Sequence, residues 1–117
     1  THATLVEICQ FPETRSLAVR MMEEAQKVAG KLGITFRHTI ERRINGAEGV
    51  GAHKTSMLQD VEAGLALELE PLLGAILELA RLTKTQVVTL DAVYACTKLL
   101  NKTFIESKAR VCKIPLD

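Results

Sequence analysis

Apolar side chains recur every three or four residues along most of this chain, and few segments alternate with period two. The clearest case lies between residues 16 and 32, where Leu17, Met21, Val28 and Leu32 share one helical face. A period near 3.6 residues is typical of amphipathic helices, whereas a half-buried strand repeats every two residues. The pattern therefore predicts an all-α fold.

Composition favours the same fold. Only two short segments, residues 34–36 and 86–88, have the character of strands, and we interpret both as connections. The chain contains three Phe, one Tyr and no Trp, so its core depends on Leu, Ile, Val, Ala and Met. Leu, Ala and Met lose little rotamer freedom in a helix. We expect one domain over residues 1–117, built from five or six helices.

Capping residues define the expected helix boundaries. Gly33 suits a left-handed C-cap after the helix that precedes it. Either Thr55 or Ser56 can cap a later helix, which Gly64 would end. Thr89 can cap the last helix in the same way. The expected helices cover residues 2–9, 16–32, 39–45, 57–63, 68–82 and 90–107.

The fifth of these helices is unusually apolar. Its apolar residues cover more than one face, which predicts a mostly buried central helix. Pro71 fits in its first turn, where a missing backbone N–H does no harm. The apolar residues are Leu69, Leu72, Leu73, Ile76, Leu77, Leu79 and Ala80.

Charge and hydropathy disfavour two classes of partner. Lys and Arg total 15 against 14 for Asp and Glu, a net charge of +1, so a nucleic-acid partner is not expected. A basic run near the C-terminus, Lys98, Lys102, Lys108, Arg110 and Lys113, is interrupted by Glu106 and by apolar residues. No apolar run is long enough to span a bilayer and no signal peptide is visible, so we expect no membrane partner.

The cysteines and histidines predict neither a disulfide framework nor a metal site. Cys9, Cys96 and Cys112 are widely spaced and odd in number, which favours a reducing, cytoplasmic location. Cys9 and Cys96 lie in apolar patterns and are interpreted as core residues, whereas Cys112 has basic neighbours. The three histidines, His2, His38 and His53, lack metal-ligand spacing and are interpreted as surface or capping residues.

A Gly-rich segment, residues 46–55, has the sequence GAEGVGAHKT. A phosphate-binding loop requires Gly, four residues, then Gly-Lys-Ser/Thr after a strand. Here Ala52 and His53 separate Gly51 from Lys54, and the preceding segment is predicted to be helical. The segment is therefore interpreted as a connector, and no dinucleotide fingerprint follows a strand.

The most informative stretch is HKTSMLQDVEAGLALELE, residues 53–70. It predicts a polar-capped helix, a glycine stop and a second helix that begins at Glu68. From pattern alone, Ser56 and Glu68 are helix-start residues, each contributing about 0.5–1 kcal/mol through capping or the helix dipole.

This stretch resembles the signature of the ketopantoate reductase C-terminal domain. That family has a Ser-Met-x-Gln-Asp block, a Gly-Arg turn and a Thr-Glu-Ile-Asp block, and the register between Ser56 and Glu68 agrees. The flanks are similar too, from Glu24-Ala25 in the earlier helix to Thr89-Leu90-Asp91-Ala92 in the last. The resemblance covers nearly the whole chain and is most specific in the central block.

The resemblance implies the helical domain of a two-domain reductase, like the C-terminal domains of 6-phosphogluconate dehydrogenase-like enzymes. In this family an N-terminal Rossmann domain binds NADPH, the helical domain contacts a small 2-keto acid, and a lysine acts as general acid. Ser56 would bind the substrate carboxylate, which helix N-termini favour. His53 would reach the substrate or nucleotide, and Glu68 would contact the cofactor or hold the cleft's polar network.

The chain departs from the family pattern at three positions. Leu65 replaces the Arg of the Gly-Arg turn, Leu67 replaces the Thr before the Glu, and Glu70 replaces the Asp after it. The first two changes remove polar groups near the expected cleft. A reductase that acts on another 2-keto acid is therefore an alternative.

The resemblance places no catalytic residue in these 117 residues. The family's lysine is expected upstream, and neither Lys27, Lys31 nor Lys54 matches it. The chain begins at Thr1 without an initiator Met, as an engineered boundary, proteolysis or trimming would produce. Positioning of reactants supplies roughly 7–11 kcal/mol of barrier reduction, so we expect no turnover without the NADPH-binding half.

Three functional hypotheses follow. The first is the substrate-binding half of an NADPH-dependent 2-dehydropantoate (ketopantoate) reductase in pantothenate synthesis. The second is a paralogous reductase of another 2-keto acid, which a substrate panel would distinguish. The third is a non-enzymatic helical interaction module, suggested by the broad apolar helix 68–82. A homodimer through the helical domain is compatible with all three.

Overall fold

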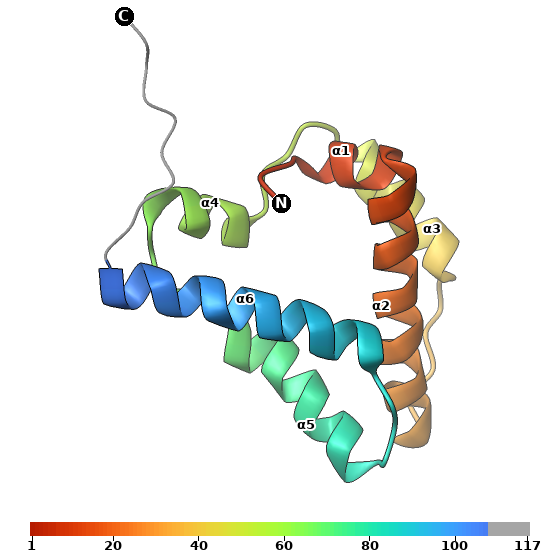
Figure 1. Ribbon diagram of the computed structural model, residues 1–117. Coiled ribbons are helices and arrows are strands. Elements are labelled where there is room, and N and C mark those ends of the chain that lie inside the picture. The colour runs from red at the N-terminus through yellow and green to blue at the C-terminus, as the bar shows by residue number, and fades with distance from the viewer. Residues whose placement is uncertain (108–117) are drawn as a thin grey trace, which may run out of the picture.

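The computed structural model describes residues 1–107, and in this range the chain is helical without any strand (Figure 1). The all-α prediction is confirmed, and residues 34–36 and 86–87 are connections. The predictions for Cys112 and for the basic residues beyond 107 fall outside this range. The helices are α1 (Leu5–Gln10), α2 (Pro12–Lys31), α3 (Ile40–Gly49), α4 (Ser56–Ala63), α5 (Ala75–Leu82) and α6 (Val88–Ser107), with a π-helical turn, η1 (Glu70–Gly74), directly before α5.

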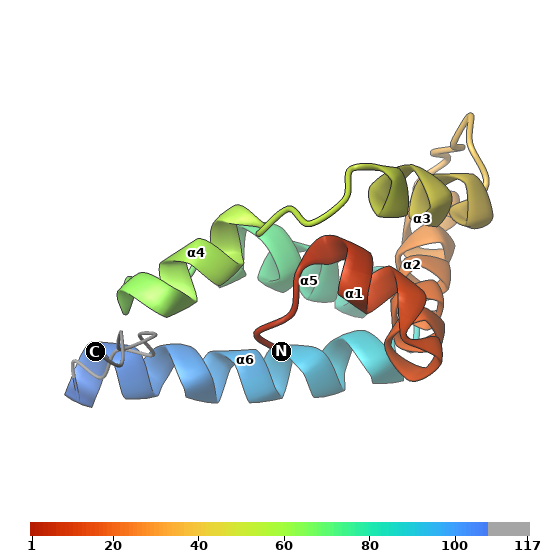
Figure 2. The ribbon, with the colours of Figure 1, turned by 90° about the horizontal axis from the view of Figure 1, so that it is seen from above.

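Two long helices, α2 and α6, organise the fold. The start of α6 packs against α2, while α1 and α3 pack on the other end of α2 (Figure 1). Helix α5 runs obliquely to α6 (Figure 1), and seen from above α4 and α5 lie on the same side of α6 (Figure 2). The smallest extent of the molecule is 20 Å, about two helix diameters. Most helices therefore have one packed side and one exposed side.

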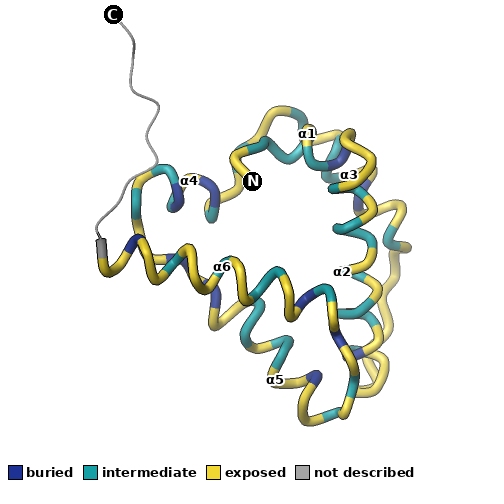
Figure 3. The backbone as a smooth tube through the Cα atoms, viewed as in Figure 1, coloured by how far each residue is buried: buried dark blue, intermediate teal, exposed yellow. Residues whose placement is uncertain are grey.

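The core consists of two separate apolar clusters. The first joins α2, α5 and the start of α6, and comprises Val28, Ala80, Val87 and Leu90. The second joins α4, the link after it and the end of α6, and comprises Val61, Leu67, Leu69 and Phe104. Leu73, in η1, packs against both. Buried positions are correspondingly sparse along the backbone (Figure 3).

Helix α2 begins earlier than predicted. Its first residue is Pro12, four positions before Ser16. Proline presets a helical φ and lacks an N–H that would be unpaired at this position anyway. The backbone N–H of Arg15 donates to the carbonyl of Phe11 at 2.9 Å, which confirms that the helix is already formed there.

The predicted end of α2 is confirmed at Gly33. This glycine has φ +77°, and its N–H donates to the carbonyl of Gly30 at 3.1 Å. The N–H of Ile34 donates to the carbonyl of Ala29 at 2.9 Å. These two bonds form a Schellman motif, which satisfies carbonyls that the helix end would leave unpaired.

The Gly-rich connector is shorter than predicted, because α3 continues four residues past its expected end at Asn45. Arg15 accounts for this extension. Its guanidinium contacts Glu41 at 3.0 Å, Asn45 at 2.9 Å and Glu48 at 3.2 Å, three residues on one face of α3. Only residues 50–55 remain as a connector between α3 and α4.

The prediction of a buried central helix is wrong in part. Pro71 does lie in the first helical turn, but the segment divides into η1 and α5, and only Ala80 of α5 is buried. Leu72, Leu79 and Leu82 are exposed. In a molecule two helices thick, α5 contacts α2 and η1 on one side and solvent on the other.

Helix α6 also differs from its prediction. It begins at Val88, so Thr89 is a first-turn residue and not the cap. The carboxylate of Glu24 instead accepts hydrogen bonds from the N–H groups of Thr89 and Leu90, both at 2.8 Å. Cys9 is buried as predicted, but Cys96 is exposed. Cys96 lies on the solvent side of α6, because the face of the helix that contains Leu90 and Phe104 packs on the core.

Candidate functional site

The start of α4 carries the first predicted site residue. Thr55 is the cap, since its Oγ1 accepts the N–H of Leu58 at 3.2 Å. Ser56 is therefore the first helical residue and is exposed. Its hydroxyl forms no hydrogen bond to any other residue between 1 and 107. The first-turn N–H groups of a helix carry partial positive charge, so this turn presents donors suited to an anion.

Lys54 fixes the backbone just before this turn. Its ammonium donates to both carboxylate oxygens of Glu62 at 2.9 Å, which links the start of α4 to its last turn. The side-chain amide of Gln59 donates to the Lys54 carbonyl at 3.0 Å. Because the ion pair is partly exposed, we assign it about 0.2–1 kcal/mol. Its main effect is to hold the segment that leads to Ser56.

His53 lies at the same end of α4 as Ser56. Its side chain is exposed, in agreement with the surface interpretation. Its carbonyl accepts the N–H of Leu5 at 2.9 Å, and its own N–H donates to Gly51 at 2.7 Å. The connector is thereby attached to α1, and the imidazole is three residues from Ser56 in the chain.

Glu68 lies beyond the opposite end of α4. The helix is eight residues long, about 12 Å at 1.5 Å per residue. Glu68 is exposed between the buried residues Leu67 and Leu69, and the Leu67 N–H donates to Asn101 Oδ1 at 2.9 Å. Within residues 1–107, no hydrogen bond or ion pair joins Glu68 to the other end of α4. The structure therefore brings His53 and Ser56 together and leaves Glu68 apart from them.

Helix α4, which carries Ser56, also borders an apolar groove. The groove has a volume of about 440 Å³ and is formed by α2, α4, α6 and the segment from Leu69 to Ile76. Met57, the residue after Ser56, contributes to it. Other lining residues are Met21, Met22, Leu73 and Val93. Such a surface can accommodate aliphatic groups but offers no partner for a charge.

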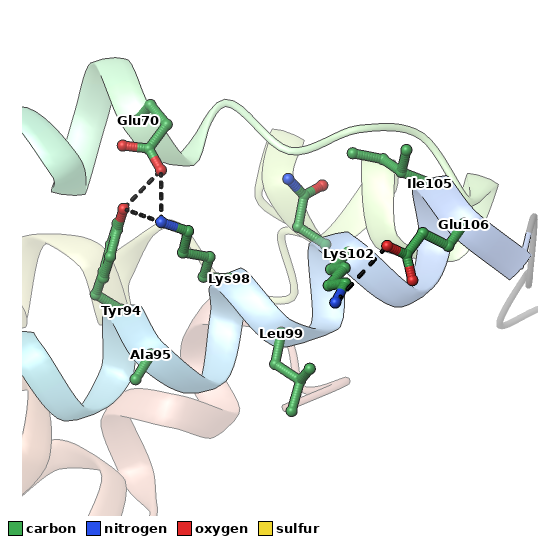
Figure 4. Close-up of a pocket in the computed structure, with 9 residues that line it drawn as sticks. Glu70, Tyr94, Ala95, Lys98, Leu99, Lys102, Ile105 and Glu106 are labelled. Carbon is green, nitrogen blue, oxygen red and sulfur yellow. Dashed lines mark hydrogen bonds and ion pairs between the residues drawn. The ribbon is translucent and has the colours of Figure 1, made fainter.

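A second hollow lies on the other side of α6 (Figure 4). The Tyr94 hydroxyl donates to Glu70 Oε1 at 2.6 Å, and the Lys98 ammonium donates to the Tyr94 oxygen at 3.3 Å. Lys98 lies 4.0 Å from Glu70 Oε1. The Tyr94 hydroxyl, and then the Glu70 carboxylate, raise the pKa of Lys98. Glu70, which departs from the family pattern, thus joins η1 to α6.

Sequence reasoning assigned no structural role to two polar residues that position these elements. Asn101 holds the link containing Glu68, and Glu24 holds the start of α6. Their partners are 34 and 65 residues away in the chain. A local pattern contains no signal for such contacts.

Two further properties concern the described residues only. None of their helices is long and apolar enough to cross a membrane. Within residues 1–107, no three His, Cys, Asp or Glu side chains gather closely enough to hold a metal ion.

Comparison with protein families identifies the domain. Residues 1–101 match the family model described as "Ketopantoate reductase PanE/ApbA C terminal". The chain belongs to this family. The resemblance of residues 53–70 to the ketopantoate reductase signature is thereby confirmed.

Individual relatives agree with this assignment. The chain is 46% identical over 100 residues to the 2-dehydropantoate 2-reductase of Mesorhizobium japonicum, a match that covers 86% of this chain and 31% of the relative. A crystal structure of 2-dehydropantoate 2-reductase from Methylococcus capsulatus superposes with a TM-score of 0.79 at 30% identity, covering 87% of this chain and 35% of that protein.

A third protein shares the fold. The ketopantoate reductase of Staphylococcus aureus, described as dimeric, superposes with a TM-score of 0.71 at 24% identity over 86% of this chain and 36% of its own length. The chain thus spans about a third of the length of the ketopantoate reductases it matches.

Proposed function

We propose that this chain is the substrate-binding part of a cytoplasmic, NADPH-dependent reductase that converts 2-dehydropantoate to pantoate in pantothenate and coenzyme A synthesis. The observation that carries the proposal is the family match over residues 1–101, together with 46% identity to a 2-dehydropantoate 2-reductase. The chain corresponds to a third of that relative, so the catalytic lysine and the nucleotide-binding domain are assigned to the rest of the protein.

In this proposal Ser56 and the first turn of α4 bind the substrate carboxylate. The Ser56 hydroxyl and the first-turn N–H groups supply donors, and the helix dipole favours the negative charge. Thr55 and Lys54 keep this turn in place through the capping bond and the pair with Glu62. His53, exposed at the same end, is assigned a second polar contact to the substrate or nucleotide.

The apolar groove that α4 borders is assigned to the remainder of the substrate. Pantoate-type acids carry an aliphatic branch next to the reacting carbon, and Met57 and its apolar neighbours offer a surface for it. Excluding water at such a surface strengthens the nearby hydrogen bonds to the carboxylate.

Glu68 is assigned to the cofactor side of the cleft. NADPH supplies the hydride when bound, and an exposed carboxylate can accept hydrogen bonds from its hydroxyl groups. Residues 1–107 contain no strand followed by a Gly-rich turn, so these residues do not fit the nucleotide's pyrophosphate. In this proposal the chain therefore contributes one contact to NADPH, through Glu68, and its main role is to bind and orient the keto acid.

The proposal is tested by steady-state kinetics on the full-length protein. Replacing Ser56 with Ala removes one hydrogen bond to a charged group, a loss of about 1.5–3 kcal/mol. We expect KM for 2-dehydropantoate to rise by roughly 10- to 100-fold, with partial rescue in Ser56→Thr. Ser16→Ala, at an exposed serine of α2, is the matched control. Wild-type KM in Ser56→Ala would remove Ser56 from the site.

The assignment of Glu68 has a separate test. Glu68→Gln keeps the size of the side chain and removes its charge, so we expect weaker NADPH binding or slower turnover with little change in stability. Glu78→Gln, at an exposed glutamate of α5, serves as the control. Equal cofactor affinity and turnover in both variants would contradict the assignment.

A paralogous reductase of another 2-keto acid remains the second candidate, and Leu65 favours it. Leu65 is exposed where the family pattern has Arg. Leu67, the other apolar departure from the family pattern, is buried in the second cluster with Val61, Leu69 and Phe104. This change therefore alters the core and does not alter the exposed surface. A panel of 2-keto acids distinguishes the two functions, since higher kcat/KM for a different acid would favour the paralogue.

We also propose that the full-length protein is a homodimer through its helical domain. The proposal is supported by the ketopantoate reductase of Staphylococcus aureus, which is described as dimeric and has the same fold. The exposed apolar side chains of α5 and α6 offer surfaces for such a contact.

A further inference from the structure

We propose that Arg15 of α2 is a positioning residue for the substrate contacts assigned to His53 and Ser56. The inference rests on the proposed function and adds to it a residue that does not touch the substrate. Arg15 acts on the connector, residues 50–55, which joins α3 to α4 and leads to Ser56. It does so through α1 and α3, the two helices to which the connector is bonded.

The Arg15 guanidinium joins α1 to α3, which pack against each other at one end of α2 (Figure 1). Its Nη1 donates to the backbone carbonyl of Cys9, in the last turn of α1, at 3.1 Å. The same nitrogen donates to Glu48 Oε2, in the last turn of α3, at 3.2 Å. Its Nη2 donates to Glu41 and Asn45, earlier in α3. The planar fork of an arginine allows several contacts of this kind at once.

Backbone hydrogen bonds extend the contact with Glu48 into the connector. The Glu48 carbonyl accepts the N–H of Gly51 at 3.1 Å, and the Gly51 carbonyl accepts the N–H of His53 at 2.7 Å. The His53 carbonyl accepts the N–H of Leu5, the first residue of α1, at 2.9 Å. Helix α1 leads back to Arg15 Nη1, so the series of contacts is closed. We define the Arg15 ring as Arg15, Glu48, Gly51, His53, Leu5 and Cys9.

No packed side chains hold the connector in place. None of residues 50–55 is buried, and Gly51 has φ +84°, a left-handed conformation that glycine adopts most readily. Segments with few buried contacts open more easily than the helices beside them. The conformation of the connector therefore depends on its hydrogen bonds, and the Arg15 ring contains three of the backbone ones.

The position of the connector determines how the substrate contacts are aimed. His53 belongs to the Arg15 ring and Ser56 follows it by three residues, so a shift of the ring moves both relative to α2. The donors stay the same in such a shift, but small displacements of positioned groups weaken their hold on a ligand. Loss of the ring therefore weakens binding of the substrate carboxylate and leaves the chemical step, which is assigned to the rest of the protein, unchanged.

Two glutamates of α3 provide a matched pair of variants. Glu48→Ala removes one of two acceptors of Arg15 Nη1 and opens the ring, whereas Glu41→Ala removes one of two acceptors of Nη2 outside the ring. We expect hydrogen exchange of residues 50–55 in the full-length protein to accelerate at least about threefold in Glu48→Ala. In Glu41→Ala these residues are expected to exchange as in the wild type.

Steady-state kinetics of the same two variants measure the effect on the site. We expect KM for 2-dehydropantoate to rise about three- to tenfold in Glu48→Ala, with kcat within about twofold of the wild type, because binding weakens equally in the ground state and the transition state. Glu41→Ala is expected to keep the wild-type KM. A variant that is only less stable would contain less active protein, which lowers kcat and leaves KM unchanged.

A double-variant cycle tests whether Glu48 acts through Arg15. We expect KM in Arg15→Ala to rise at least as much as in Glu48→Ala, and adding Glu48→Ala to Arg15→Ala to change it no further, since residues of one network are not additive. Arg20→Ala is the control background, because the Arg20 guanidinium bonds Ser16 of its own helix. There Glu48→Ala keeps its full effect. Thermal unfolding shows that each variant is folded at the assay temperature.

The outcomes separate this inference from the proposed function. If Ser56→Ala raises KM but Glu48→Ala and Glu41→Ala have equal KM, the positioning role of Arg15 is overturned and the site stands. Wild-type exchange of residues 50–55 in Glu48→Ala, or independent effects of Arg15→Ala and Glu48→Ala, overturns the ring in the same way. A wild-type KM in Ser56→Ala overturns the site itself, and the positioning role with it.

Discussion

The carboxylate of Glu24 in α2 accepts a 2.8 Å hydrogen bond from the backbone N–H of Leu90 in α6. Its other oxygen accepts the N–H of Thr89 at 2.8 Å. The first turn of a helix leaves N–H groups unpaired, and a carboxylate there also complements the helix dipole. A residue in another helix therefore performs the capping role, which fixes the start of α6 against α2.

Removing this contact is expected to destabilise the fold. Glu24→Ala leaves two first-turn N–H groups of α6 without their partner, a loss of about 1–2 kcal/mol by analogy with helix-cap substitutions. Urea unfolding measures it as a lower midpoint at constant slope. Glu23→Ala is the control, because Glu23 is an exposed neighbour on the same helix. Equal losses in both variants would show that the capping contact contributes nothing specific.

The same contact predicts a pH dependence. Partial burial alone raises the pKa of Glu24, but the hydrogen bonds from Leu90 and Thr89 outweigh it, and the pKa lies below its ordinary value. A lowered folded-state pKa stabilises the fold fully above the ordinary glutamate pKa of about 4.3, and this stability is lost as pH falls through the lowered pKa.

The measurement compares wild type and Glu24→Gln by chemical unfolding between neutral and acidic pH. We expect the wild type to be more stable above about pH 5 and the difference to shrink as pH falls below the ordinary glutamate pKa. Glu23→Gln is expected to follow the wild-type curve. A difference between wild type and Glu24→Gln that is constant with pH would contradict the linkage.

Two glycines near the end of α2 predict opposite effects of the same substitution. Gly33 has φ +77°, so Gly33→Ala forces a side chain into the left-handed region, at a cost of about 1 kcal/mol. Gly30 is inside the helix, and a Cβ there meets nothing within 4 Å. Gly30→Ala is expected to stabilise by about 0.5–1 kcal/mol. Thermal unfolding of the two variants checks both signs, and the same sign in both would refute the Schellman assignment.

Asn101 predicts a local effect near Glu68. Asn101→Ala removes the acceptor of the Leu67 N–H, and we expect a loss of about 1 kcal/mol and faster hydrogen exchange at Leu67. Because Glu68 follows directly, cofactor affinity of the full-length protein is expected to fall as well. Gln10→Ala, at the exposed last residue of α1, is the control. Unchanged exchange at Leu67 would rule out an anchoring role for Asn101.

The elements that local pattern predicted well are those whose signals are local. Gly33 and Gly64 end their helices in the left-handed conformation, as their positions after apolar periodic segments indicate. Thr55 caps α4, one of the two residues that the pattern allowed. Cys9, in a short apolar segment, is buried. Each outcome depends on side chains within a few residues of one another.

The errors share a different cause. The extension of α3 depends on Arg15, and the start of α6 depends on Glu24, both far away in the chain. The exposure of Cys96 and Leu79 follows from how few layers the molecule has, which periodicity does not reveal. The family resemblance identified the candidate site residues His53, Ser56 and Glu68. Contacts between helices that are distant in the chain determine how these residues are held.

Leu73 packs against both apolar clusters. One cluster secures α2 to the start of α6 and the other secures the end of α4, so a leucine in a π-helical turn couples the unfolding of these two halves, alongside helix α6, which runs through both clusters. A smaller side chain at this position would allow α4 to open while α2 and α6 stay folded. The helix that carries Ser56 would then act as an independently melting unit, with its opening controlled by a residue of the groove beneath it.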